Sequence, residues 1–204
     1  MMTWLKRAAA VIGIVLLADP AFAHHVMGGR TPSTFMEGLL SGLAHPVIGI
    51  DHLAFLLAVG IVVGVAGLRL WMPAVFVVAS AVGVALHVQA TNIPGVELMV
   101  ALSLVVVGAL VAGGIRLSSE PWSVLFAAGG LLHGYAYGES IFGAETSPLA
   151  AYLIGLVVVQ SALTIAIAAG VRRLKATTIA PRLAGAAIAG VGIAVLAQQI
   201  FPAG

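Results

Sequence analysis

The sequence predicts an all-α, polytopic membrane protein, and two features of its composition lead to this prediction. Hydrophobic residues make up 61% of the 204-residue chain and charged residues only 8%, with a mean hydropathy of +1.16. A soluble domain carries about 25% charged residues. The apolar residues also gather into stretches of about 20, the length that a helix needs to cross a bilayer. The nine basic residues are scattered and form no patch for nucleic acid.

Residues 1–23 have the features of a cleavable signal peptide. Lys6 and Arg7 precede an apolar core at 8–18, and a small-x-small Ala-Phe-Ala sequence ends at residue 23. The alternative is an uncleaved anchor helix, but the apolar core is short for a span of about 20 residues. We therefore expect cleavage before His24 and a mature N-terminus on the outer side of a membrane.

The mature chain, residues 24–204, is expected to form a single domain of six transmembrane helices. Six apolar stretches approach the length of a span, and proline, glycine or charged residues separate them. Their approximate limits are 46–67, 71–88, 96–115, 121–139, 149–171 and 182–201.

The basic residues indicate how these spans are oriented. With the N-terminus outside, the inner loops hold six basic residues and the outer segments hold one, Arg30. The six are Arg69, Arg116, Arg172, Arg173, Lys175 and Arg182. Such a bias in short loops follows the positive-inside rule. Both mature termini are therefore predicted to lie outside.

The stretch HPVIGIDH at 45–52 places two imidazoles and a carboxylate at the mouth of the first span. Ionisable groups at the edge of a lipid-buried helix are functional candidates. The alternative is a set of helix-terminal residues facing water, with Pro46 at the first helical position. His45 and His52 would lie about 10 Å apart along a straight helix, too far for one ion with bonds of about 2 Å. Either the helix is irregular between Pro46 and Gly49, or His45 meets the ion first and His52 binds it deeper.

The predicted topology brings four further polar residues into the same outer leaflet, where we expect one shared site. His87 ends the second span, Glu97 starts the third, and His133 and Glu139 lie in the outer half of the fourth. Imidazole with carboxylate suits divalent nickel, cobalt or zinc, and the absence of cysteine excludes thiolate ligands. We expect Asp51, His52 and His133 to bind one such ion.

The fourth span carries His133 and Glu139 at the two ends of the sequence HGYAYGE, residues 133–139. Gly134 and Gly138 are four residues apart, a spacing that lets another helix approach closely. Helix packing alone would place both tyrosines in the interfacial aromatic belt. We expect packing and metal handling together, with the glycines bringing a neighbouring helix close and His133 and Glu139 using that proximity.

Together, HPxxGxDH after a signal peptide, Glu97 opening the third span and HGYAYGE in the fourth resemble the HupE/UreJ family. The resemblance implies a nickel or cobalt permease of the bacterial inner membrane, a transporter and not an enzyme. Carried over by position, it implies metal handling by His45, Asp51, His52, Glu97, His133 and Glu139. The chain departs from the family pattern at Tyr137, where many members have a second histidine, and at the adjacent Gly138 and Glu139. His87 rests on the topology alone.

Two other functions use the same histidines. A membrane cytochrome would ligate haem b with histidines from two helices, but it would not require the carboxylates. An intramembrane zinc hydrolase would use His52, His87 and His133 as ligands and Asp51 as general base. We expect a permease with no bound cofactor, whose partners are the divalent metal ion and the lipid bilayer. A homo-oligomer and a cytoplasmic metallochaperone remain open as further partners.

Overall fold

The computed structural model describes residues 30–173 and 179–201, and the regular structure in this part of the chain is all helical. The elements are α3 (Phe35–Ile48), α4 (Ile50–Val65), α5 (Pro73–Val88), α6 (Val96–Gly113), α7 (Ser119–Gly138), the 3-10 helix η1 (Glu139–Ile141), α8 (Thr146–Arg173) and α9 (Ile179–Ile200). The predicted all-α class is therefore confirmed. The expected signal peptide, residues 1–23, lies outside the described residues.

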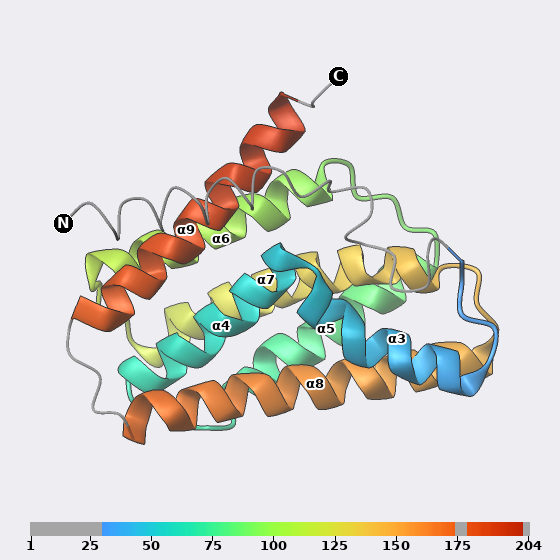
Figure 1. Cartoon of the computed structure of the whole chain (residues 1–204), viewed down its shortest axis with the longest axis horizontal. Helices are drawn as coiled ribbons and strands as arrows, with labels where there is room; N and C mark the ends of the chain where they lie inside the picture. The colour runs from blue at the N-terminus through green and yellow to red at the C-terminus, as the bar shows by residue number, and fades with distance from the viewer. Residues whose placement is uncertain (1–29, 174–178, 202–204) are drawn as a thin grey trace, which may run out of the picture.

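The helices run back and forth along one long axis (Figure 1). Three pairs pack most intimately: α3 with α8, α5 with α7, and α6 with α9. Figure 1 shows α6 and α9 side by side along one edge, with α4 and α7 between them and α8. Each end of the bundle is therefore formed by the starts of some helices and the ends of others.

Glycine makes each of these three pairs close. A Cβ on Gly42 of α3 would overlap the carbonyl oxygen of Tyr152 on α8, and one on Gly134 of α7 would overlap that of Ser80 on α5. A Cβ on Gly108 of α6 would likewise overlap the backbone nitrogen of Ala189 on α9. Backbones that approach this closely gain packing contacts that a larger residue would prevent.

The first expected span is broken. The sequence predicts one helix over 46–67, but α3 ends at Ile48, Gly49 is extended (φ −69°, ψ 115°), and α4 starts at Ile50. The two helix axes meet at 77°. His45 and Pro46 therefore lie in the last turn of α3 and not at the start of a span, because a helix over Phe35–Ile48 precedes them. Of the two sequence-based alternatives, the irregular helix is the one present.

The other five expected stretches agree with α5 to α9 within three residues at each boundary. Three helices, α6, α8 and α9, are long and apolar enough to cross a membrane, and the bent pair α3–α4 makes a fourth if it is counted as one span. α5 is apolar but has 16 residues. The described part of the chain is thus a membrane-type helical bundle.

Candidate metal centre at the break between α3 and α4

Three histidines meet at the α3–α4 break, and their side chains are at most 1% exposed. His45 comes from the end of α3, His52 from the first turn of α4, and His133 from α7. The ring centroids of His45 and His52 are 5.6 Å apart, and those of His52 and His133 are 5.2 Å apart. The bend at Gly49 brings His45 to His52, which a straight helix would hold about 10 Å apart.

Gly49 itself is required by this arrangement. A Cβ at this position would lie 2.7 Å from Cδ2 of the His52 ring and 3.1 Å from Oδ1 of Asp51. Gly49 takes part in the hydrogen bonding of both helices, because its N–H donates to the His45 carbonyl (3.2 Å) and its carbonyl accepts from Leu53 N–H (2.8 Å). The bend at this shared residue turns the two imidazoles towards each other.

The closest contact in the cluster joins the Nδ1 atoms of His52 and His133, which are 3.0 Å apart. Without an ion, one Nδ1–H donates to the other Nδ1. Two nitrogens bound at a right angle to one ion, with bonds of about 2.1 Å, also lie about 3.0 Å apart. The pair therefore has the spacing of two adjacent ligands of one divalent metal ion.

A serine on α6 determines which nitrogen of His133 is available. Ser103 donates its hydroxyl proton to the carbonyl of Val100 (2.6 Å), so its oxygen accepts from Nε2–H of His133 (3.1 Å). The proton on Nε2 leaves the Nδ1 lone pair facing His52. Histidines that bind metals are commonly held in this way by a hydrogen bond from the second ring nitrogen.

Tyr152 of α8 likewise determines which nitrogen of His45 carries the proton. Its hydroxyl donates to the carbonyl of Tyr137 (2.8 Å), so its oxygen accepts from Nδ1–H of His45 (3.0 Å). Ser140 Oγ lies 2.9 Å from the same Nδ1 atom. The proton on Nδ1 makes Nε2 the nitrogen through which His45 can bind a metal.

Tyr137 is part of the centre and not of an interfacial belt. The side chain is fully buried, and its ring lies 4.3 Å from that of His52 and 5.1 Å from that of His45, between centroids. Tyr135 has a different role, because its hydroxyl donates to the carbonyl of Thr91 and accepts from the N–H of Ile93 (3.1 Å). It thereby ties the α5–α6 connection to α7.

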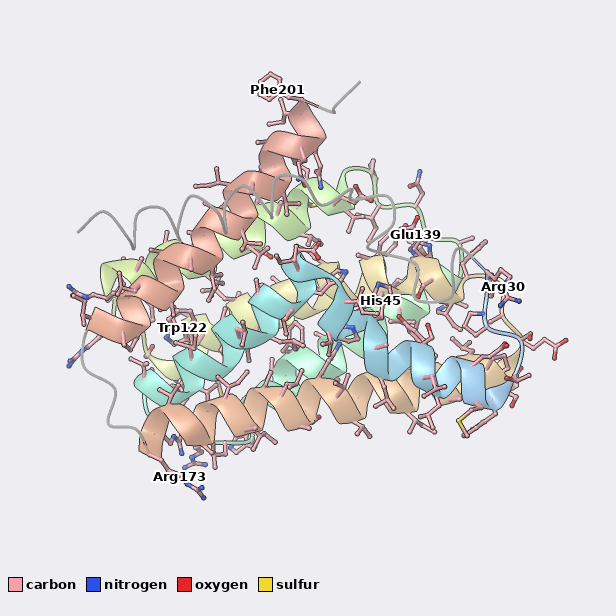
Figure 2. The ribbon with its side chains drawn as sticks, viewed as in Figure 1. Arg30, His45, Trp122, Glu139, Arg173 and Phe201 are labelled. Atoms are coloured by element: carbon pink, nitrogen blue, oxygen red, sulfur yellow. The ribbon has the colours of Figure 1, made fainter. Side chains whose placement is uncertain are left out.

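The predicted carboxylates line a cavity next to the histidines. Asp51, Glu97 and Glu139 border a space of about 670 Å³ at one end of the bundle. Asp51 is 7% exposed, its Oδ1 accepts from the backbone N–H of His52 (2.8 Å), and the same oxygen lies 4.0 Å from Nδ1 of His52. Asp51 therefore stands between the cavity and the cluster. Figure 2 shows Glu139 beside the break that carries His45.

His87 lies apart from the other three histidines. It is half-buried on α5, and its ring contacts Tyr135 and Phe142, with centroid distances of 4.5 and 5.8 Å. Among the described residues, no three His, Asp or Glu side chains are placed as they stand to hold one ion. The shared site expected from topology thus resolves into a buried histidine cluster, a carboxylate cavity and a separate His87.

Sequence reasoning missed four residues of the centre: Ser103, Tyr137, Ser140 and Tyr152. Tyr137 is present in the motif, but the sequence alone favours a packing role for it. Ser103 and Tyr152 are single polar positions in apolar stretches, and their place becomes clear only once α6 and α8 are packed against α7 and α3.

The two ends of the bundle carry opposite charges. Five arginines of the described residues lie at the end opposite the carboxylate cavity, which we call the arginine end. They are Arg69 and Arg116 in helix connections, Arg172 and Arg173 in the last turn of α8, and Arg182 in the first turn of α9. Glu120, in the first turn of α7, is the one described acid there. Figure 2 shows Arg173 at this end and Arg30 and Glu139 at the other.

Fold and site together define an all-helical bundle of membrane type, with a buried imidazole cluster next to a carboxylate-lined cavity. The chain belongs to the HupE/UreJ family, whose model, described as HupE / UreJ protein, matches residues 12–195. It is also 30% identical over 196 residues to "Protein HupE" of Rhizobium leguminosarum bv. viciae, and the match covers 94% of this chain and 99% of that protein. No solved structure matches the chain.

Proposed function

We propose that this protein is a permease that takes divalent nickel, or cobalt, across a bacterial inner membrane for metalloenzyme or cobalamin maturation. Zinc is a third candidate ion. Membership of the HupE/UreJ family supports a role related to nickel or cobalt transport. The observation that carries the proposal is the His52–His133 pair, with two Nδ1 atoms 3.0 Å apart and one tautomer held by Ser103.

The carboxylate cavity supplies the approach to this pair. Three carboxylates attract a divalent cation and replace part of its hydration with oxygen ligands, and the imidazoles then bind it more tightly. Binding by Asp51, His52 and His133 together requires the Asp51 carboxylate to turn from the His52 N–H towards the two imidazoles. His45 lies next to His52, with ring centroids 5.6 Å apart, and offers a further imidazole beyond the His52–His133 pair.

The proposed topology places the carboxylate cavity outside. We propose six spans after cleavage of residues 1–23, with both mature termini outside and the arginine end in the cytoplasm. The positive-inside bias supports this orientation. The bent pair α3–α4 supports counting its two short helices as one interrupted span, as in transporters that bind ions where helices are broken.

We propose passive transport. Beyond the cluster, towards the arginine end, the described core is apolar, with Phe55, Phe76 and Phe126 fully buried. The polar groups at intermediate depth are neutral, such as Gln160, which donates to Ser80 (3.0 Å). A proton relay would commonly use a buried carboxylate there. Consumption of the metal in the cytoplasm would then sustain uptake.

The geometry favours neither alternative function. A haem would need space for its macrocycle between the two histidines that hold it, but His52 and His133 are in direct hydrogen-bond contact, with their Nδ1 atoms 3.0 Å apart. For the hydrolase, His87 would have to join His52 and His133, but the ring contacts of His87 are with Tyr135 and Phe142.

Reconstitution in proteoliposomes tests the function. With a nickel-sensitive dye inside, metal should enter without ATP or an imposed proton gradient and stop at equal free concentration on both sides. Cobalt and zinc are compared at the same free concentration. Accumulation above equality only under a proton gradient would refute passive transport, and no entry of any of the three ions would refute the permease.

A further inference from the structure

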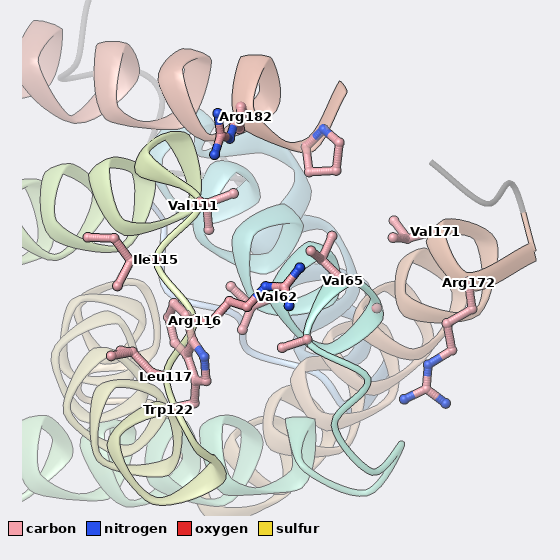
Figure 3. A pocket seen from close by; sticks show the side chains of 14 residues that line it. Val62, Val65, Val111, Ile115, Arg116, Leu117, Trp122, Val171, Arg172 and Arg182 are labelled. Carbon is pink, nitrogen blue, oxygen red and sulfur yellow. The ribbon is translucent and has the colours of Figure 1, made fainter. Parts of the chain in front are cut away.

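A second cavity, at the arginine end, takes no part in the proposed permease. It encloses about 820 Å³ between the ends of α4, α6 and α8 and the starts of α7 and α9 (Figure 3). Much of its wall is apolar, including Val62, Val65, Val111, Ile115 and Leu117. Pockets that bind small molecules commonly enclose about 300–1,000 Å³, so the space is large enough for a specific ligand.

Three arginines border this cavity, and no acidic residue of the described chain lines it. Arg172 is engaged, because it donates to the carbonyls of Val63 (3.5 Å) and Leu68. In the described residues, no hydrogen bond or ion pair involves the guanidinium of Arg116 or Arg182. Two cations therefore border an apolar space without a protein anion to balance them.

The side chain of Arg182 lies against the end of α6 at this rim. Gly114 ends α6 in the left-handed conformation (φ +66°), and a Cβ on it would lie 2.6 Å from Nη2 and 2.8 Å from Nε of Arg182. The guanidinium thus packs against the backbone of Gly114, which has no side chain to keep it away. In Figure 3, Arg182 lies at the top of the view and the side chain of Arg116 reaches into its centre.

Trp122 provides an independent sign of a ligand. It lines the cavity and is 2% exposed, yet its indole N–H has no hydrogen-bond partner in the described structure. A buried donor without an acceptor is costly, and the great majority of such groups are paired. An acceptor inside the cavity would satisfy it.

We propose that this cavity binds an anionic phospholipid, with the headgroup phosphate between Arg116 and Arg182 and within reach of the Trp122 N–H. The upper part of one acyl chain would lie against the valine and isoleucine wall. Charge complementarity supports an anion, and the combination of an apolar wall with a cationic rim favours an amphiphile over a free anion. Basic pockets between transmembrane helices are known to bind anionic headgroups.

The bound phosphate would also change the field at this end of the bundle. Arg116, Arg172 and Arg182 together repel a divalent cation that approaches from the histidines. A phosphate between two of them offsets this repulsion. The lipid site does not depend on the proposed permease, because it rests on residues of the arginine end alone.

The test uses the fluorescence of Trp122. Trp4 and the 57% exposed Trp71 are replaced by Phe, which leaves Trp122 as the single tryptophan. The protein is placed in phosphatidylcholine vesicles that contain a small fraction of brominated phosphatidylglycerol or, separately, brominated phosphatidylcholine. We expect stronger quenching by the anionic lipid. Arg116→Gln and Arg182→Gln should each weaken the preference by roughly fivefold, the usual effect of one arginine near an anionic lipid.

Arg173→Gln is the matched control, since Arg173 lies at the same end but does not line the cavity. Equal quenching by both lipids, or an equal loss in Arg173→Gln, would overturn the proposal, because the effect would then be general. Competition by inorganic phosphate alone would assign the site to a free anion and overturn the lipid. If the arginine variants do not fold, native mass spectrometry of the unsubstituted protein in a mixture of the two lipids measures the same preference.

Discussion

The two cavities share four helices and differ in the sign of their charge. α4, α6, α7 and α9 contribute to both. The cavity beside the histidines, of about 670 Å³, carries three carboxylates, and the one at the arginine end, of about 820 Å³, carries three guanidinium groups. Helix packing alone therefore does not determine the charge of an end. The side chains at helix starts and ends give the two cavities opposite charge.

The largest expected effect tests whether the imidazoles near the carboxylate cavity bind the ion. His52→Ala should reduce high-affinity nickel uptake by at least about 100-fold, since losing even a supporting residue of a metal site costs about 10–100-fold. Uptake of radioactive nickel at trace concentration measures it. His87→Ala is the matched control and should cost far less, because His87 lies apart from the cluster. Normal uptake by a well-expressed His52→Ala protein would remove the histidine pair from the mechanism.

A second substitution disturbs the geometry of the histidine side without removing a ligand. Gly134→Val should destabilise the protein by about 3 kcal/mol, because the side chain would overlap the backbone at Ser80 and push α7, with His133, away from α5. Thermal unfolding in detergent measures this. Gly170→Ala on α8, where a Cβ meets open space, should be neutral or slightly stabilising. Equal stability of the two variants would contradict the close approach of α5 and α7.

The tautomer of His133 can be tested at Ser103. Ser103→Ala removes the oxygen that accepts from Nε2–H, and metal affinity should fall by about tenfold. Ser123→Ala, which removes a hydroxyl bonded to the Ser119 carbonyl at the other end of the bundle, is the control. Calorimetric titration with nickel compares the two. A Ser103→Ala protein with unchanged affinity would mean that the hydrogen bond does not orient the ligand.

The histidine side should also respond to pH. Imidazole must be neutral to bind a metal, and free histidine titrates near pH 6.5. Affinity should therefore fall as the outer pH is lowered, and the fall should begin below the range in which free histidine titrates, because burial disfavours the charged imidazolium. Binding measured in non-coordinating buffers gives the profile. A profile that stays flat down to the pH at which the protein unfolds would mean that the histidines are not ligands.

The smallest effect should come from the carboxylate cavity. Glu97→Gln with Glu139→Gln should slow nickel capture by about fivefold at low salt and by less at high salt, because exposed charges act through a screened field. Stopped-flow measurement with a metal-sensitive dye gives the rate. Glu145→Gln, an exposed residue outside the cavity, is the control. A salt-independent loss would instead make one of the two glutamates a direct ligand.

Much of the fold could be predicted because apolar length carries the information. The stretches that form α5 to α9 are bounded by glycine, proline or charge, and the sequence locates each of them within three residues. The helix Phe35–Ile48 was not expected, because it is short and contains Glu37, Ser41 and His45 among its apolar residues. Its position depends on Gly38 and Gly42 meeting α8, a contact between segments more than 100 residues apart.

Four of the predicted metal-handling residues, His45, Asp51, His52 and His133, lie close together, since the motif holds three of them within eight residues. Their arrangement was not predictable from the sequence, and metal binding by them stays a prediction. The predicted depth of His87 in the membrane is the same as that of the other histidines, so depth could not show that His87 lies apart from them. That depends on which faces of α5 and α7 meet, and depth does not give this. Helix α9 illustrates the same limit: it packs through Gly185 and Gly192, whereas Gly190 meets open space.

The break at Gly49 has a consequence for how the protein is made. Helix α3 has 14 residues and rises about 21 Å, less than the hydrocarbon core of about 30 Å. It cannot hold itself across a bilayer and depends on α8, where Tyr152, 107 residues later, accepts from His45. The ribosome must therefore synthesise α8 before the last imidazole is fixed. Newly inserted chains therefore have no complete histidine cluster, and binding of the proposed metal ion there would report on the end of assembly.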